Sequence, residues 1–222
     1  MSSPSMTHEE LLVTLSARIL ALPDDAVRVV AIDGMGGAGK TTLAAELAVV
    51  VGGAGRPVVP VAYDDFHHPR ERRYRRGRLS AEGYLEDAFD PESLRALVLE
   101  PVAAESGQVR QAAYDLAADE PADGQTVPVG PGTVVIVEGC FLLARELGDP
   151  WDLAVLVVAD PKVVLDRVLV RDADLGPPEQ VRELYVRRYF GAWSLYEERN
   201  DPWSRADVVV DLTDPTTPKV LG

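Results

Sequence analysis

The most informative segment of this 222-residue chain reads Val29-Val30-Ala31-Ile32-Asp33-Gly34-Met35-Gly36-Gly37-Ala38-Gly39-Lys40-Thr41-Thr42. Its apolar first part is typical of a buried parallel strand, and a glycine-rich turn ending in a lysine and two threonines follows. The helical pattern of residues 43–48 comes next. A strand, a G-x-x-x-x-G-K-[ST] turn and a helix in this order form a P-loop, so we predict that residues 34–42 bind the phosphates of a nucleoside triphosphate.

Each residue type in the turn suits an anionic ligand. The glycines permit positive φ angles, and they let successive backbone N–H groups face phosphate oxygens. The positive end of the following helix dipole adds to the attraction. We expect Lys40 to reach the β and γ phosphates and Thr41 to offer its hydroxyl to Mg²⁺.

A second motif overlaps the first. The glycines at 34, 36 and 39 also satisfy G-x-G-x-x-G, the fingerprint of dinucleotide binding. The lysine favours the P-loop, because the chain has 19 arginines and only 3 lysines, and one of the three is Lys40. A nicotinamide-dependent oxidoreductase therefore stays as the less favoured alternative.

Composition restricts the class of protein. The net charge of −14 opposes binding to nucleic acids and to acidic membranes, because the summed field repels polyanions. The single cysteine, Cys140, excludes an internal disulfide, and we interpret it as a small core side chain rather than a nucleophile. Residues 1–10 lack the features of a signal peptide, and no apolar stretch is long enough to span a membrane. We expect a soluble, cytoplasmic protein, either a monomer or a homo-oligomer.

Strand and helix patterns alternate along most of the chain, which predicts an α/β protein with three layers and a central parallel sheet. We expect a single domain over residues 1–222, with an N-terminal helix within 1–22, loops at 119–132 and 172–178, and a frayed tail at 214–222. Aromatic residues at helical spacing predict one packed face of a long helix over 179–199. Strands are predicted at 28–33, 56–63, 133–137, 153–158 and 206–210. The other helices are predicted from the pattern that begins at 43 to about 51, and at 161–171.

Acidic residues follow two of the predicted strands. Asp64 and Asp65 come after the strand that ends at Tyr63, and Glu138 comes after the strand that ends at Val137. In a parallel sheet these positions meet at the carboxyl edge, where ligands bind. We predict Asp64 as the catalytic base toward a hydroxyl, Asp65 as a turn residue and Glu138 as the acid on the metal side.

Further short motifs occur in a characteristic order. They are Tyr63-Asp64-Asp65-Phe66-His67, Asp87-Ala88-Phe89-Asp90, Tyr114-Asp115, Val137-Glu138-Gly139, Arg167 to Arg171-Asp172, and Ala206-Asp207-Val208-Val209. With them, residues 29–210 resemble the uridine kinases and phosphoribulokinases. The resemblance implies a P-loop kinase fold, ATP with Mg²⁺ as cofactors, a small-molecule alcohol as acceptor, and a small arginine-bearing helical lid, which would lie at 171–180.

Roles for individual residues come with this resemblance. Arg167 and Arg171 lie four residues apart on one helical face, where they would clamp phosphates; a surface salt-bridge face is the alternative. Thr41 and Glu138 would serve the metal. The candidate substrate contacts are Asp64, Phe66, His67, Arg70, Tyr84 and Tyr114.

The chain also departs from the uridine kinase pattern. Gly83-Tyr84-Leu85-Glu86 stands where those enzymes carry Phe-Asp-His-Pro, and Leu116-Ala117-Ala118-Asp119 lacks the histidine that reads the pyrimidine. These changes argue against uridine as the acceptor. Residues 70–78 contain six arginines, which either bind an anionic group of the acceptor or pair with the many carboxylates of the protein.

These patterns favour an ATP-dependent phosphotransferase that acts on an alcohol group of a small molecule. A nucleotide-binding switch that hydrolyses ATP or GTP slowly is the alternative from another class. The lack of an Asn-Lys-x-Asp motif argues against the switch.

Overall fold

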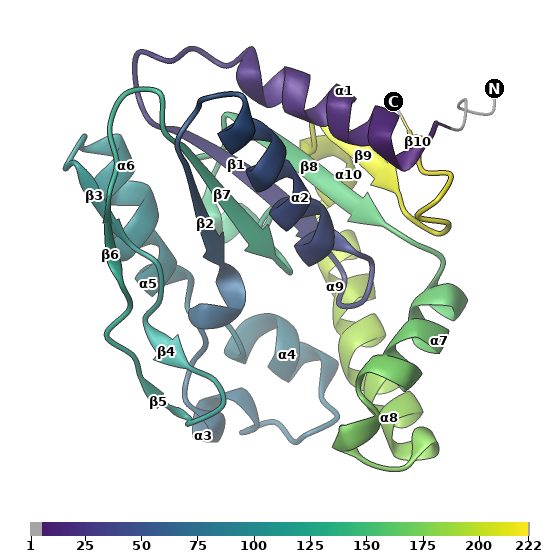
Figure 1. Ribbon diagram of the computed structural model, residues 1–222. Helices are drawn as coiled ribbons and strands as arrows, with labels where there is room; N and C mark the ends of the chain where they lie inside the picture. The colour runs from purple at the N-terminus through teal and green to yellow at the C-terminus, as the bar shows by residue number, and fades with distance from the viewer. Residues whose placement is uncertain (1–5, 222) are drawn as a thin grey trace.

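A six-stranded sheet forms the centre of the computed structural model, which describes residues 6–221 (Figure 1). The strand order is β10-β9-β8-β1-β7-β2, and every neighbouring pair is parallel except β10 with β9. The predicted α/β fold with a central parallel sheet is therefore confirmed. The strands are β1 (Arg28–Gly34), β2 (Val58–Ala62), β7 (Val134–Gly139), β8 (Leu153–Val158), β9 (Val208–Asp211) and β10 (Lys219–Val220).

Strand β1 lies between β7 and β8 in the sheet. Its residues from Val29 onward are all buried, as its continuous apolar sequence requires. The register pairs Ile32 with Glu138, and it pairs Ala62 at the end of β2 with the same Glu138. The carboxyl ends of β1, β7 and β2 therefore lie side by side.

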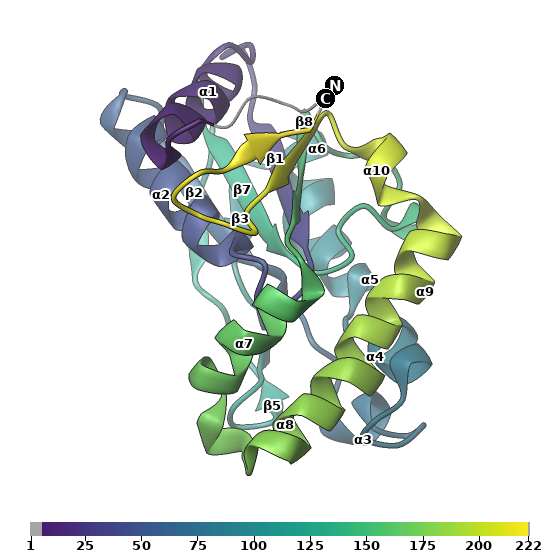
Figure 2. The ribbon, with the colours of Figure 1, turned by 90° about the vertical axis from the view of Figure 1, so that its right-hand side faces the viewer.

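Helices cover both faces of the sheet, and Figure 2 separates the layers. One face carries α1 (His8–Leu20) and α2 (Lys40–Gly53), and the other carries α9 (Gly191–Asn200) and α10 (Pro202–Arg205). Beyond the carboxyl ends of the strands lie α3 (Arg70–Arg73), α4 (Ala81–Asp87), α7 (Pro161–Arg171) and α8 (Pro178–Leu184) (Figure 1). The short helices α5 (Pro91–Leu94) and α6 (Glu100–Ala103) flank a π-helical turn, Arg95–Leu99.

The long aromatic helix is present as predicted. Helix α8, a π-helical turn (Tyr185–Phe190) and α9 follow one another without a break. The side chains of Tyr185, Trp193 and Tyr196 are buried. This helix crosses from the sheet to the region beyond its carboxyl edge.

Two predicted loops contain regular structure. Residues 119–132 contain β5 (Glu120–Pro121) and β6 (Thr126–Pro128), which pair with β4 (Tyr114–Asp115) and β3 (Gln108–Arg110). Residues 172–178 contain a 3₁₀ turn, Ala173–Leu175. These elements were missed because two or three residues are too few to show a period.

The prediction of a frayed tail was wrong for the described part of it. Lys219 and Val220 pair with β9, and the Leu221 N–H donates to the Val209 carbonyl at 2.8 Å. The backbone hydrogen bonds of this strand hold the tail. Gly222 and residues 1–5 lie outside the described residues. No helix within 6–221 is long and apolar enough to cross a membrane.

Candidate active site

The P-loop links β1 to α2 at the carboxyl edge of the sheet. Gly37 has φ +88°, and a Cβ atom there would lie 2.6 Å from Val168 Cγ1. Gly39 has φ +109° and precedes the first residue of α2, whose first turn receives no side-chain cap. Left-handed backbone and uncapped N–H groups at a helix start suit a phosphate.

Lys40 is the first residue of α2, and its side chain is buried against acidic neighbours. Its Nζ lies 4.0 Å from Glu138 Oε2. Burial is the largest single influence and lowers the pKa of Lys40, but the acidic groups of Cys140, Glu138 and Asp64 together raise this pKa above its usual value. Lys40 is therefore a permanent positive charge beside the loop.

Thr41 and Glu138 supply two oxygen ligands at the same place. The Thr41 hydroxyl donates to Glu138 Oε2 at 3.0 Å. Burial, followed by the charge of Asp64, raises the pKa of Glu138, while Lys40 and the Thr41 hydroxyl lower it. Residues 6–221 hold no cluster of three or more His, Cys, Asp or Glu side chains that could bind a metal. A hydroxyl and a carboxylate alone fit Mg²⁺, which usually has few protein ligands and completes its shell with phosphates and water.

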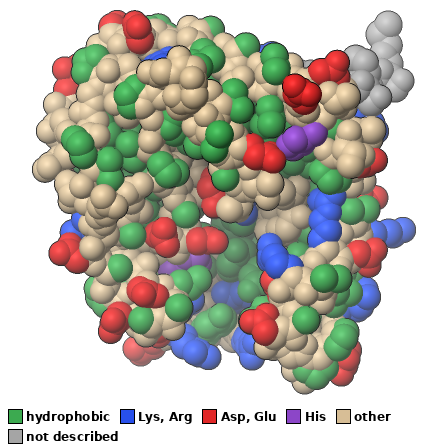
Figure 3. All heavy atoms as spheres, in the orientation of Figure 1, with side chains coloured by type: hydrophobic (Ala, Val, Ile, Leu, Met, Phe, Trp, Pro, Cys, Tyr) green, Lys and Arg blue, Asp and Glu red, His purple; other side chains and the backbone are tan. Residues whose placement is uncertain are grey.

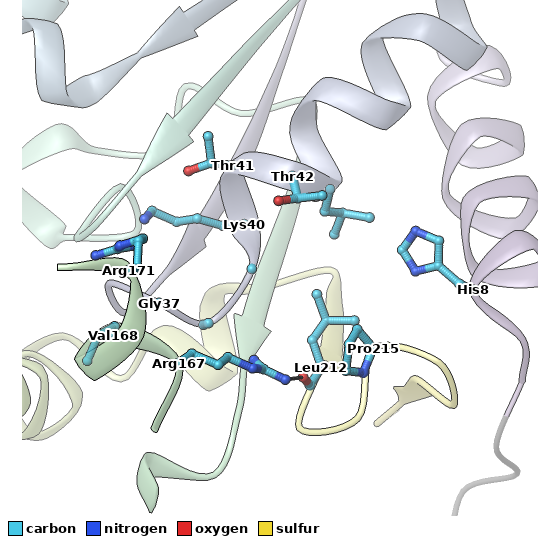
Figure 4. A pocket seen from close by; sticks show the side chains of 13 residues that line it. His8, Gly37, Lys40, Thr41, Thr42, Arg167, Val168, Arg171, Leu212 and Pro215 are labelled. Carbon is cyan, nitrogen blue, oxygen red and sulfur yellow. Dashed lines mark hydrogen bonds between the residues drawn. The ribbon is translucent and has the colours of Figure 1, made fainter. Parts of the chain in front are cut away.

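Two cavities meet at the P-loop, and Figure 3 shows this face hollowed below the sheet, with charged side chains on the walls. The first, which we call the P-loop cavity, is about 380 Å³ and contains residues 37–43 together with His8, Arg167, Val168, Leu212 and Pro215 in its wall (Figure 4). The second, the Asp64 cavity, is about 350 Å³. Lys40, Thr41 and Arg171 line both.

Three of the six predicted substrate contacts line the Asp64 cavity, namely Asp64, His67 and Tyr84. His67 Nδ1 lies 2.7 Å from the Asp64 carbonyl oxygen, and burial lowers the pKa of its imidazole, so the ring is neutral at pH 7.

The other three predicted contacts lie outside this wall, and their contact with a substrate stays a prediction. Phe66 is fully buried in the core. The Arg70 side chain is exposed. The Tyr114 hydroxyl donates to Asp119 at 3.0 Å.

Comparison with known proteins identifies the family. The model of the phosphoribulokinase / uridine kinase family matches residues 29–177, which is more than half of the chain. The chain belongs to the phosphoribulokinase / uridine kinase family. It is thus a P-loop kinase, and the family implies use of ATP and a small-molecule substrate that accepts phosphate on an alcohol group. The alternative of a nicotinamide-dependent oxidoreductase is wrong.

Solved structures of other proteins share the fold of this chain. A possible uridine kinase from Bacillus stearothermophilus is 28% identical, with a TM-score of 0.72 over 90% of this chain and 97% of that one. A candidate fructose transport system kinase from Silicibacter sp. TM1040 is 24% identical, with a TM-score of 0.71 over 88% and 96%. D-glycerate 3-kinase from Cryptococcus neoformans shares the fold at 14% identity, with a TM-score of 0.58 over 91% and 94%. No curated protein sequence matches the chain significantly.

The two predicted phosphate clamps of this kinase lie on α7, and both have protein partners. Arg167 Nη2 donates to the carbonyls of Leu212 and Thr213 at 2.8 and 2.9 Å (Figure 4). Arg171 donates to the Asp172 carboxylate at 2.6 and 2.9 Å and to the Tyr185 hydroxyl at 2.8 Å. Nε and Nη2 are thus occupied, so a phosphate contact by these two nitrogens requires an exchange of partners.

Half of the arginines in the run of this kinase have carboxylate partners. Three of its arginines bind carboxylates, with Arg73–Asp119 at 2.6 Å, Arg75–Asp87 at 2.5 Å and Arg76–Glu86 at 2.6 Å. The side chains at 70, 72 and 78 are exposed and have no carboxylate within 4.0 Å among residues 6–221, and of the paired three only Arg73 is buried. Within the run, Arg73 and Tyr74 reach the Asp64 cavity.

Sequence analysis missed two buried charged residues of the kinase. Asp33 is fully buried at the end of β1 and accepts bonds from Gly34 N, Leu143 N and the Tyr196 hydroxyl. Arg188 is 1% exposed and lines the Asp64 cavity. The sequence held a signal for each residue. Asp33 is a charged residue at the end of an apolar strand, and Arg188 is a charged residue within a helix rich in aromatic side chains.

Cys140 behaves as the sequence indicated. Its side chain is buried, and burial raises the pKa of the thiol to about 11, so it is protonated at neutral pH. The sulfur also borders the Asp64 cavity. A neutral thiol is a poor nucleophile, which fits a structural role.

Proposed function

We propose that this kinase transfers the γ-phosphoryl group of ATP to an alcohol group of a small molecule bound in the Asp64 cavity. One observation supports this proposal above the others: Asp64 lines the same cavity as the P-loop residues Gly36, Lys40 and Thr41. A carboxylate that faces the end of a phosphate site can orient an acceptor hydroxyl and receive its proton.

The chain's own groups would carry out most of the remaining work through position and charge. The P-loop backbone and Lys40 would bind the β and γ phosphates. Thr41 and Glu138 would hold Mg²⁺, which when bound neutralises charge on the phosphoryl oxygens. The nucleoside part of ATP would occupy the P-loop cavity.

The position of Asp64 depends on close packing of backbone. Asp64 lies in the 3₁₀ turn Tyr63–Asp65 that follows β2. A Cβ atom at Gly139 would lie 2.5 Å from Tyr63 Cβ, so this turn packs directly against the end of β7, next to Glu138. The base and the metal-side acid are therefore anchored to neighbouring strand ends.

The end of α7 and the following turn would serve as the lid, residues 171–180. Arg171 lines both cavities, so its guanidinium is near the path of the transferred group. In this proposal a phosphate replaces Asp172 as the partner of Arg171, and Arg167 anchors the helix through the carbonyls after β9.

The experiment compares Asp64→Asn with Asp65→Asn. Nucleosides, nucleoside monophosphates, sugar phosphates and pantothenate-like alcohols are first screened for acceptor-dependent ADP release by the unaltered enzyme. We expect Asp64→Asn to retain binding of an ATP analogue and to lose about 10²- to 10⁴-fold in turnover of the acceptor that is found. Asp65 is exposed on the same turn and lies outside the Asp64 cavity, so it is the matched control.

Two results would contradict this proposal. Unchanged turnover in Asp64→Asn would remove Asp64 from the role of base. Tight ATP binding with slow ADP release that no acceptor accelerates would favour the nucleotide-dependent switch.

A further inference from the structure

Arg188 lies in the π-helical turn between α8 and α9, and its side chain is almost completely buried. Its guanidinium donates to the carbonyl oxygens of Arg73 at 3.2 Å and of Arg78 and Ser80 at 3.3 Å. Two of these carbonyls belong to the arginine run and the third follows it by two residues, and together they fix the position of the guanidinium. They carry no net negative charge.

The positive charge of Arg188 has no acidic partner among residues 6–221. No carboxylate lies within 4.0 Å of its nitrogens, whereas Arg73 has Asp119 and Arg171 has Asp172. The Nε atom of Arg188 has no hydrogen-bond partner in that part of the chain. A buried charge without a counter-charge is unfavourable, so a bound group of opposite charge would stabilise Arg188 where it lies.

Two tyrosines surround the same guanidinium. Its central carbon lies 4.8 Å from the centre of the Tyr74 ring and 5.1 Å from that of the Tyr84 ring. These contacts attract a cation weakly and hold the guanidinium plane in place. They leave the charge itself unbalanced.

Arg188 and Arg73 both line the Asp64 cavity. They come from the junction of α8 with α9 and from α3, which lie away from the sheet in Figures 1 and 2, whereas Lys40 and Thr41 lie at the sheet edge. The Nε atom of Arg73 is also buried and has no partner within residues 6–221. The cavity therefore has a phosphate-binding end at the P-loop and a second cationic end at these arginines.

We propose that the acceptor alcohol carries an oxyanion, either a phosphate or a carboxylate, and that Arg188 with Arg73 binds it. This inference rests on the proposed function, in which the Asp64 cavity holds the acceptor. A guanidinium donates two parallel N–H bonds to an oxyanion and supplies the opposite charge, so such a group satisfies both needs of Arg188. The hydroxyl of a neutral alcohol can accept a hydrogen bond from this guanidinium, but it supplies no opposite charge.

Equilibrium binding tests the inference apart from turnover. The protein is saturated with AMP-PNP and Mg²⁺, so that the P-loop is filled, and is titrated by calorimetry with ribulose 5-phosphate, D-glycerate, uridine and fructose. We expect at least one of the two anions to bind about tenfold or more tightly than both neutral compounds. The two anions separate a phosphate site from a carboxylate site.

Variants then assign the site to its residues. We expect Arg188→Gln to weaken binding of the anion by about 10- to 100-fold, the loss typical of a charge-assisted hydrogen-bonded pair. Arg187→Gln is the matched control, because Arg187 is the neighbouring residue, is exposed and pairs with Glu183 at 2.9 Å. If circular dichroism shows that Arg188→Gln is unfolded, Arg73→Gln takes its place, with the same expected direction.

Several results would overturn the inference. The inference fails if uridine and fructose bind as tightly as the two anions. It also fails if neither anion binds. If Arg188→Gln and the unaltered protein bound the anion with equal affinity, Arg188 would not be part of the anion site. Failure of the proposed function looks different: an anion binds in an Arg188-dependent manner, yet no alcohol accelerates ADP release.

Discussion

The contact between Asp33 and Tyr196 yields a quantitative prediction for Tyr196→Phe. The Tyr196 hydroxyl donates to Asp33 Oδ2 at 2.5 Å, and both side chains are fully buried. The bond joins the end of β1, directly before the P-loop, to the long helix that also carries Arg188. In the variant, Asp33 keeps the N–H groups of Gly34 at 2.7 Å and Leu143 at 3.2 Å.

The expected loss follows from the kind of bond. A hydrogen bond to a carboxylate contributes about 1.5–3 kcal/mol, and removal of one oxygen atom leaves little empty volume. For a chain of this length, 1 kcal/mol corresponds to about 2–4 °C, so Tm should fall by about 3–12 °C. Burial raises the pKa of Asp33, and its charged form needs the donor most, so the deficit should grow as pH rises through that pKa.

Thermal and urea unfolding at pH 7.5 and at pH 5 measure this loss. Tyr63→Phe is the control, because Tyr63 is 3% exposed and its hydroxyl makes no hydrogen bond within residues 6–221. We expect this control to lose less stability than Tyr196→Phe, because the substitution removes no hydrogen bond of the described structure. If Tyr196→Phe lost no more stability than Tyr63→Phe, the Asp33–Tyr196 bond would make no net contribution and the reasoning would be refuted.

Two further predictions concern the P-loop and His67. Gly37→Ala should lower stability by about 1 kcal/mol or more and weaken AMP-PNP binding, because the new Cβ meets Val168 at 2.6 Å and φ is +88°. Gly36→Ala is the control for stability, because its Cβ meets nothing within 4 Å. Equal melting temperatures of the two variants would contradict the argument. Burial lowers the pKa of His67, so the folded protein binds fewer protons than the unfolded chain just below about pH 6.5, and stability should fall as pH falls from there. Urea unfolding at pH 7.5 and 5.5 should show a smaller fall in His67→Gln, and an unchanged fall would exclude His67 as its source.

Local patterns explain the parts of the structure that the sequence predicted well. Helix α7 spans residues 161–171 as expected, because a proline starts its first turn and apolar residues repeat on one face. The P-loop was recognisable for the same reason, since a strand, a turn and a helix are contiguous there. The positions of Asp64 and Glu138 followed from the rule that parallel strands end at one edge.

Contacts between distant residues were beyond this kind of prediction. Tyr196 is 163 residues from Asp33, and Arg188 is 115 residues from Arg73. Phe66 shares a motif with Asp64, yet its side chain turns into the core and not toward the cavity. Which side of a turn a residue faces depends on the packing around it, and no spacing in one sequence records that packing.

The arginines show why the number of charges in a segment is a weak guide to a binding site. With a net charge of −14, this protein has carboxylates to spare, and Arg75 and Arg76 find them in α4 and at its end. A buried arginine can stay without an acidic partner in such a chain where the fold keeps carboxylates away from it. Arg188 is in that position because tyrosine rings and backbone carbonyls surround it. Its single unbalanced charge is therefore stronger support for an anionic ligand than the six arginines that first drew attention to this part of the chain.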